Sequence, residues 1–430
     1  MEVQRSEYLK RLIGFKDKDL IKVVVGIRRC GKSTLLKLYA DYLRSIGVEN
    51  NRIQFINFED FNNAELTDYK VLHEHVLSRL APGGMNYIFL DEIQLVKDFE
   101  KAANSLRLRE NIDLYITGSN AYFLSGELAT LLAGRYVTIE MTPLSFSEYC
   151  AAVTASAAAS TGASAEGPSV PEGTLKLYDQ YLRYSSFPYT LELDNDIEKV
   201  HQYLAAIIDT IVLKDVVQRK QISAVAALER LMKFIFSNIG FITSTKKISD
   251  TMKSFGFNIG VQTVENYLSA LEDSFIIHKV SRLDVNGREY LKANDKYYVA
   301  DIGMRYYLLG DKMKDYGVIL ENIVYLELRR RGYKVHVGRL GDLEIDFIAF
   351  KAGTPEYYQV ALSVLDDATR ERELRPLEKI RDNYGKYIIT MDQVFGGNDR
   401  GIITVNALRW LVSSPASAPH PPPKRPQNQY

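Results

Sequence analysis

The first 150 residues alternate short, unbroken apolar runs with stretches of helical periodicity. The apolar runs occupy residues 23–25, 53–58, 87–90, 114–117 and 136–141. Runs of this length that are rich in β-branched and aromatic residues are typical of strands buried on both faces. Strands that alternate with helices along a chain pair in parallel, and the helices cover both faces of the resulting sheet. The pattern therefore predicts a three-layer α/β domain over residues 1–150.

Two segments of different character follow this predicted domain. Residues 151–170 form an Ala/Ser/Thr/Gly tract without aromatic residues or periodicity, which predicts a flexible linker or loop over residues 151–173. Helical periodicity returns over residues 174–227, with one break at residues 185–188. This second pattern predicts a helical lid.

Three further helices and a strand pair are expected over residues 228–312. The helices are predicted at residues 228–240, 246–254 and 261–274, and the strands at residues 275–281 and 296–299. Three helices followed by a two-stranded ribbon indicate a winged helix, whose third helix can read the major groove of DNA.

The predicted third helix and ribbon carry polar residues suited to contact with DNA. For bases, the helix is expected to expose Gln262, Thr263, Asn266 and Tyr267. For phosphates, the ribbon carries Lys279, Arg282, Arg288, Lys292 and Lys296. Acidic residues on the same helix would repel a phosphate backbone: Glu265, Glu272 and Asp273. DNA is the expected partner, and a protein-docking module or oligomer spacer is the alternative.

A last domain is predicted over residues 313–412, before a low-complexity tail at residues 413–430 that we expect to be disordered. Its expected order is a helix at 320–332, strands at 334–339, 344–351 and 357–364, a helix at 367–384 and a strand at 386–391. Glu321, Asp346 and Gln359 would meet at one end of such a sheet. This order resembles nucleases of the PD-(D/E)xK class, in which acidic groups hold Mg²⁺ beside a lysine.

The catalytic pattern of that nuclease class is broken in this chain. The third acid is replaced by the neutral Gln359, and Ala361 stands at the position of the lysine. Glu321 and Asp346 remain as residues that could hold a metal ion. We therefore expect a nuclease-like fold without cleavage, and an ATP-dependent nuclease stays as the alternative.

Composition and charge limit the classes of protein to which this chain can belong. A chain of 430 residues with 46% apolar content is long enough for two or three domains with ordinary cores. Its 54 basic and 54 acidic residues cancel, so binding to DNA would depend on local patches. Two cysteines cannot build a disulfide framework, and the sequence has no run of 18 apolar residues. We expect a cytoplasmic protein without a membrane partner.

The most informative motif spans residues 26–33, which read GIRRCGKS between an apolar strand and a helical stretch. This is a complete phosphate-binding loop, G-x-x-x-x-G-K-[ST], in its proper strand–loop–helix context. Gly26 and Gly31 let backbone N–H groups turn toward a phosphate at the helix N-terminus. Lys32 would reach the β- and γ-phosphates, Ser33 would ligate Mg²⁺, and Thr34 would adjoin the α-phosphate.

A second strand supports the assignment of ATP and Mg²⁺ as ligands. Residues 87–90 are apolar and end in Asp91 and Glu92. In an ATPase, Asp91 would hold the Mg²⁺ shell and Glu92 would polarise the attacking water as general base. Strands that end in acidic residues also begin ordinary loops, so this interpretation depends on the phosphate loop.

Two further residues are candidates for the catalytic machinery. Asn120 follows the apolar strand at 114–117, where it or Ser119 could orient the attacking water, or where it could simply cap the next helix. Arg135 lies between a helix and the strand at 136–141, which is a suitable position for an arginine finger acting on a neighbouring subunit. A surface salt bridge is the alternative for Arg135.

Together these motifs resemble the bacterial and archaeal AAA+ type ATPases that carry a C-terminal domain of unknown function. The similar segments cover almost the whole chain: residues 26–34, 89–94, 116–120, 134–136, 143–149, 213–215, 321–322, 344–347 and 388–392. The resemblance implies an ATPase core, a winged helix and a nuclease-like fold. It assigns the roles given above to Lys32, Ser33, Asp91, Glu92, Asn120 and Arg135, and it implies assembly into a ring. One departure is Ser185-Ser186 before Pro188, where relatives tend to have glycines.

We therefore predict an oligomeric, Mg²⁺-dependent ATPase that couples ATP hydrolysis to the binding or remodelling of DNA. Besides the nuclease, one rival is a signalling switch, in which the bound nucleotide controls contact with a protein partner.

Overall fold

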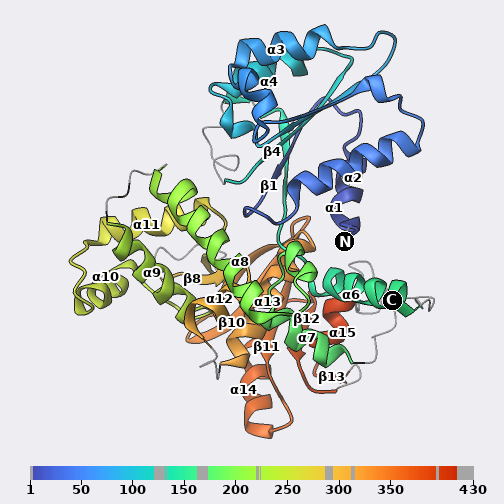
Figure 1. Ribbon diagram of the computed structural model, residues 1–430. Coiled ribbons are helices and arrows are strands. Elements are labelled where there is room, and N and C mark those ends of the chain that lie inside the picture. The colour runs from blue at the N-terminus through green and yellow to red at the C-terminus, as the bar shows by residue number, and fades with distance from the viewer. Residues whose placement is uncertain are drawn as a thin grey trace, which may run out of the picture. The chain divides into compact units, whose positions relative to one another are not determined.

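The computed structural model describes residues 3–120, 131–132, 134–161, 173–218, 222, 224–285, 294–310, 315–393 and 397–413. The chain divides into two compact units (Figure 1). Unit 1 comprises Met1–Leu144, Phe187–Val225 and Asn266–Ile277, and unit 2 comprises Ser145–Ser186, Ala226–Glu265 and His278–Tyr430. The expected boundary near residue 150 is thus close to the first division, but segments within the predicted lid and winged helix are shared between the units.

Unit 1 is built on a five-stranded sheet in the order β2-β3-β4-β1-β5. The strands are β1 (Ile21–Val25), β2 (Ile53–Asn57), β3 (Asn86–Asp91), β4 (Ile112–Gly118) and β5 (Tyr136–Glu140). Every neighbouring pair is parallel. Strands β1, β3 and β4 are buried along their whole length, as their apolar sequences require. The predicted parallel α/β core is confirmed.

Helices cover both faces of this sheet, with α1 and α2 on one side and α3 and α4 on the other (Figure 1). Their bounds are α1 (Ser6–Gly14), α2 (Lys32–Ser45), α3 (Tyr69–Ser78) and α4 (Phe99–Arg107). Unit 1 also contains the 3₁₀ segment η5 (Pro188–Glu192), helix α8 (Ile197–Thr210) and the π-helical segment η6 (Ile211–Gln218). Asp68 and Asp196 begin α3 and α8, because each carboxylate accepts two backbone N–H groups of the first turn.

Unit 2 contains a seven-stranded mixed sheet in the order β13-β14-β12-β11-β10-β9-β7. Its strands are β7 (Arg282–Asp284), β9 (Lys334–Leu340), β10 (Leu343–Lys351), β11 (Thr354–Ala361), β12 (Lys386–Thr390), β13 (Gly397–Asp399) and β14 (Ile402–Asn406). A separate two-stranded sheet pairs β6 (Ile277–Val280) with β8 (Lys296–Val299).

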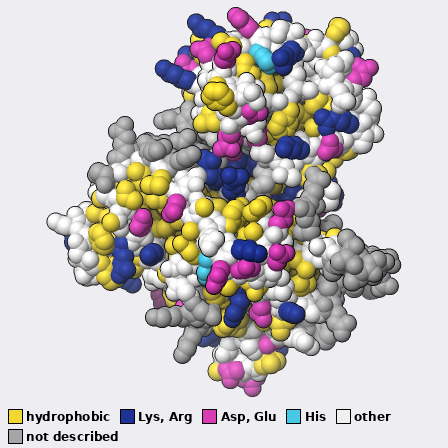
Figure 2. All heavy atoms as spheres, viewed as in Figure 1, with side chains coloured by type: hydrophobic (Ala, Val, Ile, Leu, Met, Phe, Trp, Pro, Cys, Tyr) yellow, Lys and Arg dark blue, Asp and Glu magenta, His cyan; other side chains and the backbone are white. Residues whose placement is uncertain are grey.

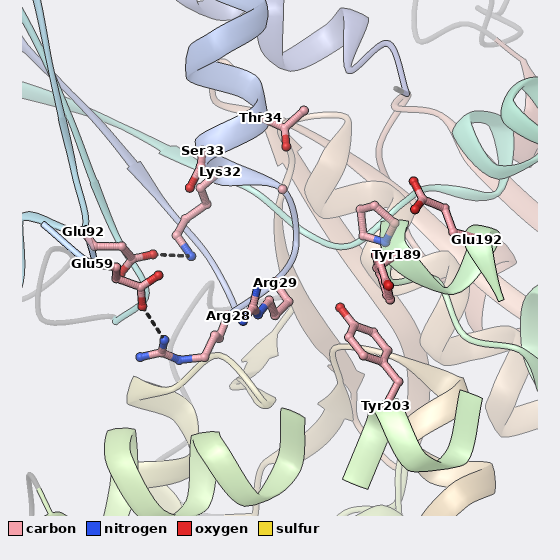
Figure 3. Close-up of a pocket in the computed structure, with 12 residues that line it drawn as sticks. Arg28, Arg29, Lys32, Ser33, Thr34, Glu59, Glu92, Tyr189, Glu192 and Tyr203 are labelled. Atoms are coloured by element: carbon pink, nitrogen blue, oxygen red, sulfur yellow. Dashed lines mark hydrogen bonds and ion pairs between the residues drawn. The ribbon is translucent and has the colours of Figure 1, made fainter. Parts of the chain in front are cut away.

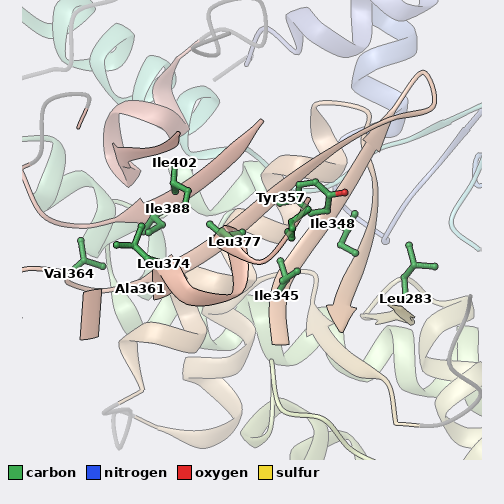
Figure 4. Packing of buried hydrophobic residues seen from close by; sticks show 11 residues of the cluster. Leu283, Ile345, Ile348, Tyr357, Ala361, Val364, Leu374, Leu377, Ile388 and Ile402 are labelled. Atoms are coloured by element: carbon green, nitrogen blue, oxygen red, sulfur yellow. The ribbon is translucent and has the colours of Figure 1, made fainter. Parts of the chain in front are cut away.

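Besides the predicted helices, the described chain from residue 146 onward contains three that were not predicted, at residues 146–161, 302–309 and 407–412. Apart from α8, the helices of this part are α6 (Phe146–Thr161), α7 (Thr174–Arg183), α9 (Val225–Ser237), α10 (Thr245–Ser254), α11 (Val261–Asp273), α12 (Ile302–Leu309), α13 (Tyr316–Arg330), α14 (Asp367–Glu378) and α15 (Ala407–Val412). Leu374 and Leu377 of α14 pack with residues of β10, β11, β12 and β14 in one buried apolar cluster (Figure 4).

The expected flexible linker is wrong over its first half, because α6 continues to Thr161. The tract is rich in alanine, the residue with the highest helix propensity, and its uniform composition hides helical periodicity. Residues 162–172 lie outside the described residues, as do residues 414–430 of the predicted tail. Helix α14 ends at Glu378, two residues after Pro376, which is earlier than the predicted end at residue 384.

Among the described residues, Cys30 and Cys150 are both buried free thiols. No helix in the described part of the chain has the length and apolar character that crossing a bilayer requires.

Candidate functional site

The phosphate loop connects β1 to α2 and needs glycine at two positions. Gly26 has φ +150°, and a Cβ atom there would lie 2.0 Å from the carbonyl oxygen of Met141. Gly31 is the N-cap of α2 with φ +103°, a backbone conformation that favours glycine. Arg29, between them, also has a positive φ of +68°. Such strain in a non-glycine residue is typical of functional loops.

Arg5 braces this loop from the N-terminal segment. Its guanidinium donates to the carbonyl oxygens of Cys30 at 3.0 Å and Thr142 at 2.7 Å, and the residue is 2% exposed. Arg5 therefore ties the loop to the segment after β5. No sequence pattern indicates this role, because the partners are backbone carbonyls distant in sequence.

Lys32 is buried at the start of α2, where its ammonium makes one hydrogen bond of ordinary length and two longer contacts. Its Nζ lies 3.1 Å from the carbonyl oxygen of Gly26, 3.5 Å from that of Ile27 and 3.6 Å from Oε1 of Glu92 (Figure 3). Long contacts of this kind leave a buried cation able to exchange its partners for a stronger anion.

Asp91 ends β3 and is completely buried. Its carboxylate accepts from the hydroxyl of Thr117 at 2.6 Å and the amide of Asn57 at 3.2 Å. Burial raises the pKa of Asp91, although hydrogen bonds from Thr117 and Ser33 oppose this shift. The contact with Ser33 brings together the two residues predicted to hold Mg²⁺.

Glu92 follows in a left-handed conformation with φ +58°, which turns its side chain toward Lys32. The carboxylate accepts from the amide of Gln94 and, at 3.2 Å, from the hydroxyl of Ser119. Burial alone would raise the pKa of Glu92, but the charge of Lys32 and the hydrogen bond from Gln94 outweigh it, so this pKa lies below its ordinary value. Glu92 is therefore an ionised carboxylate held in a fixed position.

These side chains open onto a cavity of about 530 Å³ (Figure 3), a volume suited to a small-molecule ligand. The cavity is lined by Arg28, Arg29, Gly31, Lys32, Ser33, Thr34, Glu59, Glu92, Pro188, Tyr189, Glu192 and Tyr203. The ends of β1 and β3 thus bring the predicted residues together at the carboxyl edge of a parallel sheet, where ligands of such folds bind.

Asn120 and Arg135, the two other predicted catalytic residues, lie in different parts of unit 1. Ser119 makes the contact with Glu92, whereas Asn120 lies next to it along the chain and is 3% exposed. The helix that Asn120 was expected to cap falls outside the described residues. Arg135 is exposed, and its carbonyl oxygen accepts from the N–H of Ile21 at the beginning of β1. It therefore lies at the edge of the sheet opposite the phosphate loop, beside a second cavity of about 540 Å³.

Sequence reasoning missed three residues that position the acidic pair. Asn57 and Thr117 are polar residues within the last positions of parallel strands, and this placement was a usable signal. Gln94 lies two residues after Glu92 in a 3₁₀ turn, and nothing in its sequence context distinguished it from a surface residue.

The segment before Pro188 is anchored by a buried carboxylate in unit 2. Asp301 accepts from the backbone N–H of Ser186 at 2.7 Å and from its hydroxyl at 2.6 Å. Ser185 has φ +73°, and a Cβ atom on Gly303 would lie 2.4 Å from that of Ser185. Ser185 therefore adopts a left-handed conformation that is strained for serine, and the Ser186 hydroxyl has a buried partner.

Glu321 and Asp346 also meet as expected, but around a lysine. Lys296 Nζ lies 2.9 Å from Glu321 Oε1, 2.8 Å from Glu344 Oε1 and 3.9 Å from Asp346 Oδ1. Gln359 completes the predicted group, because its Oε1 accepts from the N–H of Asp346 at 2.8 Å. The described residues contain no group of three or more His, Cys, Asp or Glu able to hold a metal ion. An ammonium thus stands where we expected a metal.

Two residues expected on a DNA-binding surface are buried. Tyr267 is 6% exposed and Lys296 is 3% exposed, because the first belongs to the apolar face of α11 and the second is paired with carboxylates. Arg288 and Lys292 fall outside the described residues. Gln262 and Asn266 are exposed as predicted, and Thr263 is half-buried.

Two family models match parts of the chain. Residues 18–150 match a family model described as an AAA domain, and residues 175–315 match one described as a domain of unknown function (DUF8612). Among solved structures, the Walker-type ATPase PABY2304 of Pyrococcus abyssi has a TM-score of 0.49 and 13% identity, covering 71% of this chain and 95% of that one. Orc1 of Aeropyrum pernix, solved in complex with DNA, has a TM-score of 0.32 and 14% identity, with coverage of 72% and 93%. Likeness at this level says nothing of ligands.

Two curated relatives match along nearly their whole length. An uncharacterized protein of Haemophilus influenzae is 38% identical over 95% of this chain and 98% of its own. Uncharacterized protein MJ1544 of Methanocaldococcus jannaschii is 30% identical over 91% of this chain and 86% of its own. The chain therefore belongs to the family that includes these two proteins, with an AAA domain at residues 18–150.

Proposed function

We propose that this protein is a Mg²⁺-dependent ATPase whose catalytic site is the cavity at the phosphate loop. The observation that carries the proposal is the convergence of Lys32, Ser33 and Glu92 on one cavity at the ends of two parallel strands, with the buried Asp91 directly before Glu92 in the chain. The loop backbone and the N-terminus of α2 would bind phosphates. Ser33 and Asp91 fit Mg²⁺, because a hydroxyl and a carboxylate already contact each other there. When bound, the ion would neutralise charge on the phosphates.

Glu92 would act as the general base in hydrolysis. A water oxygen attacks the γ-phosphorus, the bond from that phosphorus to the bridging oxygen of ADP breaks, and Glu92 accepts the proton of the water. Lys32 would leave Glu92 for the phosphates on ATP binding. Since the charge of Lys32 lowers the pKa of Glu92, this exchange makes Glu92 more basic when the substrate is present. Gln94 and Ser119 keep its carboxylate in place.

Glu92→Gln tests this mechanism. The variant should bind ATP with the parent affinity and hydrolyse it about 10²- to 10⁴-fold more slowly, since only the proton acceptor is lost. Glu74→Gln, on the exposed side of α3, is the matched control and should hydrolyse ATP at the parent rate. Parent turnover in Glu92→Gln would disprove the assignment of the base.

Arg135 supports an oligomer as the active form. Within one chain it lies at the sheet edge opposite the phosphate loop, so its action on ATP requires a second subunit. We propose a ring in which Arg135 reaches the γ-phosphate bound by its neighbour. Arg135→Ala should be inactive, and mixing it with Glu92→Gln should restore part of the activity. Without restoration, the shared site would be rejected.

The second half of the chain would couple hydrolysis to DNA. We assign residues 174–227 to a lid, 228–312 to a winged helix and 313–412 to a nuclease-like fold. The support is the observed order of α9, α10, α11, β6 and β8, and then of α13, β9, β10, β11, α14 and β12. Exposed basic and polar residues that would contact DNA in this proposal include Lys246, Lys253, Gln262 and Asn266.

The charge pattern limits how DNA would be held. Basic and acidic side chains are interspersed over much of the face shown in Figure 2, so contacts would be local. ATPase rates should therefore be measured with single-stranded, duplex and branched DNA at low and higher salt. Stimulation by one form that fades with salt would support a DNA-coupled motor. Indifference to every DNA would favour the nucleotide-gated switch on a protein partner.

Cleavage of DNA is not part of the proposed function. Lys296 already neutralises part of the charge on Glu321 and Asp346, and the lysine of the nuclease pattern is absent from β11, where Ala361 stands. Nicking of plasmid DNA with Mg²⁺ or Mn²⁺ that is lost in Asp346→Ala would establish the nuclease instead.

A further inference from the structure

Unit 1 contains a second cavity at the edge of the sheet opposite the phosphate loop. Its volume is about 540 Å³, a size suited to a small-molecule ligand. Four parallel strands bring its lining together at or just before their first residues: Asp17 and Asp19 before β1, Met85 before β3, Asp113 in β4 and Arg135 before β5. The phosphate loop follows the last residue of β1, at the other end of these strands. The two cavities are therefore separate, and ATP in the first would leave the second open.

Arg107 is the buried cation of this second cavity. It is the last residue of α4, lines the cavity and is 9% exposed. Its Nη1 donates to Oδ1 of Asp19 at 2.5 Å, whereas its Nε is buried and has no hydrogen-bond partner in the described part of the chain. A buried N–H group without an acceptor is destabilising. An anion bound in the cavity would supply the acceptor that this nitrogen lacks.

The one carboxylate that pairs with Arg107 can be displaced from it. The side chain of Asp19 is 79% exposed, against 8% for Arg107. An exposed carboxylate loses little when water replaces its partner, so an anion from solvent can take its place on the guanidinium. Asp19 is therefore an internal competitor for any anion that enters the cavity.

Three further cations line the same cavity: Lys18, Arg109 and Arg135. All three are exposed, and within the described residues none of them forms an ion pair. Arg135 already has a proposed role at a neighbouring subunit. The cavity is therefore best tested through Arg107 and Arg109.

Most of the acidic residues that line the cavity already have partners. Asp113 pairs with the completely buried Lys22, and Asp17 pairs with Lys16. Glu110 remains as an exposed carboxylate. Three exposed cations and the incompletely paired Arg107 therefore outnumber the acids that could neutralise them, which gives the cavity a positive character.

We propose that this cavity binds a small organic phosphate through Arg107 and Arg109. A phosphate monoester carries nearly two negative charges and three acceptor oxygens at neutral pH, and the guanidinium fork matches such a group. The apolar part of the ligand would contact Met85 and Leu108, and Leu108 is 69% exposed. An enclosed arginine in a concave site favours a small molecule over the DNA backbone. The site does not depend on ATP hydrolysis.

Phenyl phosphate is the probe, since it combines a phosphate with an apolar ring. Ligand-observed NMR titrations should use the full chain with Lys32→Ala, in which the phosphate loop has lost its lysine. This protein should bind the probe. Adding Arg107→Met should weaken binding about 10- to 100-fold, because charge-assisted hydrogen bonds are lost. Adding Arg109→Ala should weaken it about 2- to 5-fold. Arg79→Ala, an exposed arginine outside the cavity, is the control and should have no effect.

Asp19→Asn, added to Lys32→Ala, should have the opposite effect. Removal of the competing carboxylate should strengthen binding of the probe about 2- to 5-fold, which a purely structural role of Asp19 would not produce. Asp19 and Arg109 are both exposed. Their variants therefore keep the test decisive even where Arg107→Met fails to fold.

Four results would overturn the second site and leave the phosphate loop untouched. The first is no binding of phenyl phosphate to Lys32→Ala, and the second is binding that neither arginine variant weakens. Benzoate bound as tightly as phenyl phosphate would assign the cavity to carboxylates. Complete displacement of the probe by a duplex oligonucleotide would assign it to DNA. Unchanged or weaker binding in Asp19→Asn would contradict the displacement of Asp19 by the ligand.

Discussion

Two buried lysines in this protein differ in how closely carboxylates pair with them and in whether a cavity lies beside them. Lys32 in unit 1 and Lys296 in unit 2 are 4% and 3% exposed, and both face carboxylates. Lys32 meets Glu92 at 3.6 Å beside a cavity of about 530 Å³. Lys296 is held at 2.9 Å by Glu321 and at 2.8 Å by Glu344, with Asp346 at 3.9 Å. The first has weak partners and space for a ligand, whereas the second has strong partners.

The difference distinguishes a buried lysine that can bind a ligand, Lys32, from one whose partners are already in place, Lys296. A buried cation is stable only when paired, and the weak pairing of Lys32 with Glu92 leaves it ready to bind a phosphate. Around Lys296 the carboxylates outnumber the ammonium, and their charges raise its pKa even though burial alone would lower it. Lys296 is therefore a structural cation. The presence of a lysine among acids is not sufficient to identify a catalytic site.

The largest effect should come from Lys296→Met, which removes the cation and leaves the carboxylates buried without it. Breaking a buried ion pair in this way costs about 3–5 kcal/mol of unfolding free energy. The chain has a single tryptophan, Trp410, which is buried in α15 of unit 2. Its fluorescence during urea unfolding should report a lower midpoint for the variant.

Two further variants sharpen the result with Lys296. Lys279→Met removes a lysine whose side chain is 45% exposed and whose partner Asp295 lies at 3.1 Å, so it should change stability by less than about 1 kcal/mol. Adding Glu321→Gln to Lys296→Met should recover part of the loss, because one uncompensated charge is removed. Equal stability of the parent and Lys296→Met would mean that the carboxylates do not depend on this cation.

Lys32→Ala should produce the opposite pattern. Its contacts are long, so unit 1 should fold normally, while ATP affinity falls and kcat/KM falls about 10²- to 10³-fold, the usual effect of losing a donor to a charged reacting group. Lys37→Ala, on the exposed side of the same helix, is the control and should match the parent in both ATP binding and turnover. Unchanged affinity and rate in Lys32→Ala would refute the phosphate-loop assignment.

The contrast between the lysines also shows what the sequence could predict. The phosphate loop, Asp91 and Glu92 were found because their chemistry follows the order of residues along strand ends, which a parallel sheet preserves in space. Lys296 was assigned to a DNA-facing ribbon, since charge on a short strand is ordinarily solvated. Its true partners come from α13 and β10: Glu321, Glu344 and Asp346. No local sequence pattern indicates that these carboxylates lie beside Lys296.

The same limit applies to the wall of the nucleotide cavity. Residues 185–188 were noted as a break between helices, but the contact of Pro188 with Gly31 joins positions more than 150 residues apart in the sequence. Periodicity predicts helices such as α8 because each buries one face. It does not predict which residue of that helix, here the partly buried Tyr203, lies beside a loop from another part of the chain.

The smallest expected effect is a pH dependence of stability. It tests whether the carboxyl groups around Lys296 outnumber its single positive charge. Burial and the charge of Glu321 raise the pKa of Asp346 well above its ordinary value, although Lys296 opposes the shift. Because the folded-state pKa is raised, the contribution of Asp346 to stability is fully present below its unfolded pKa of about 4. That contribution is lost as pH rises through the folded pKa. Asp346→Asn keeps a neutral side chain at every pH, so the stability of the parent relative to this variant should fall as pH increases from 4 upward. Urea unfolding followed by Trp410 fluorescence at several pH values measures this difference, and a constant difference would show that folding does not raise the pKa of Asp346.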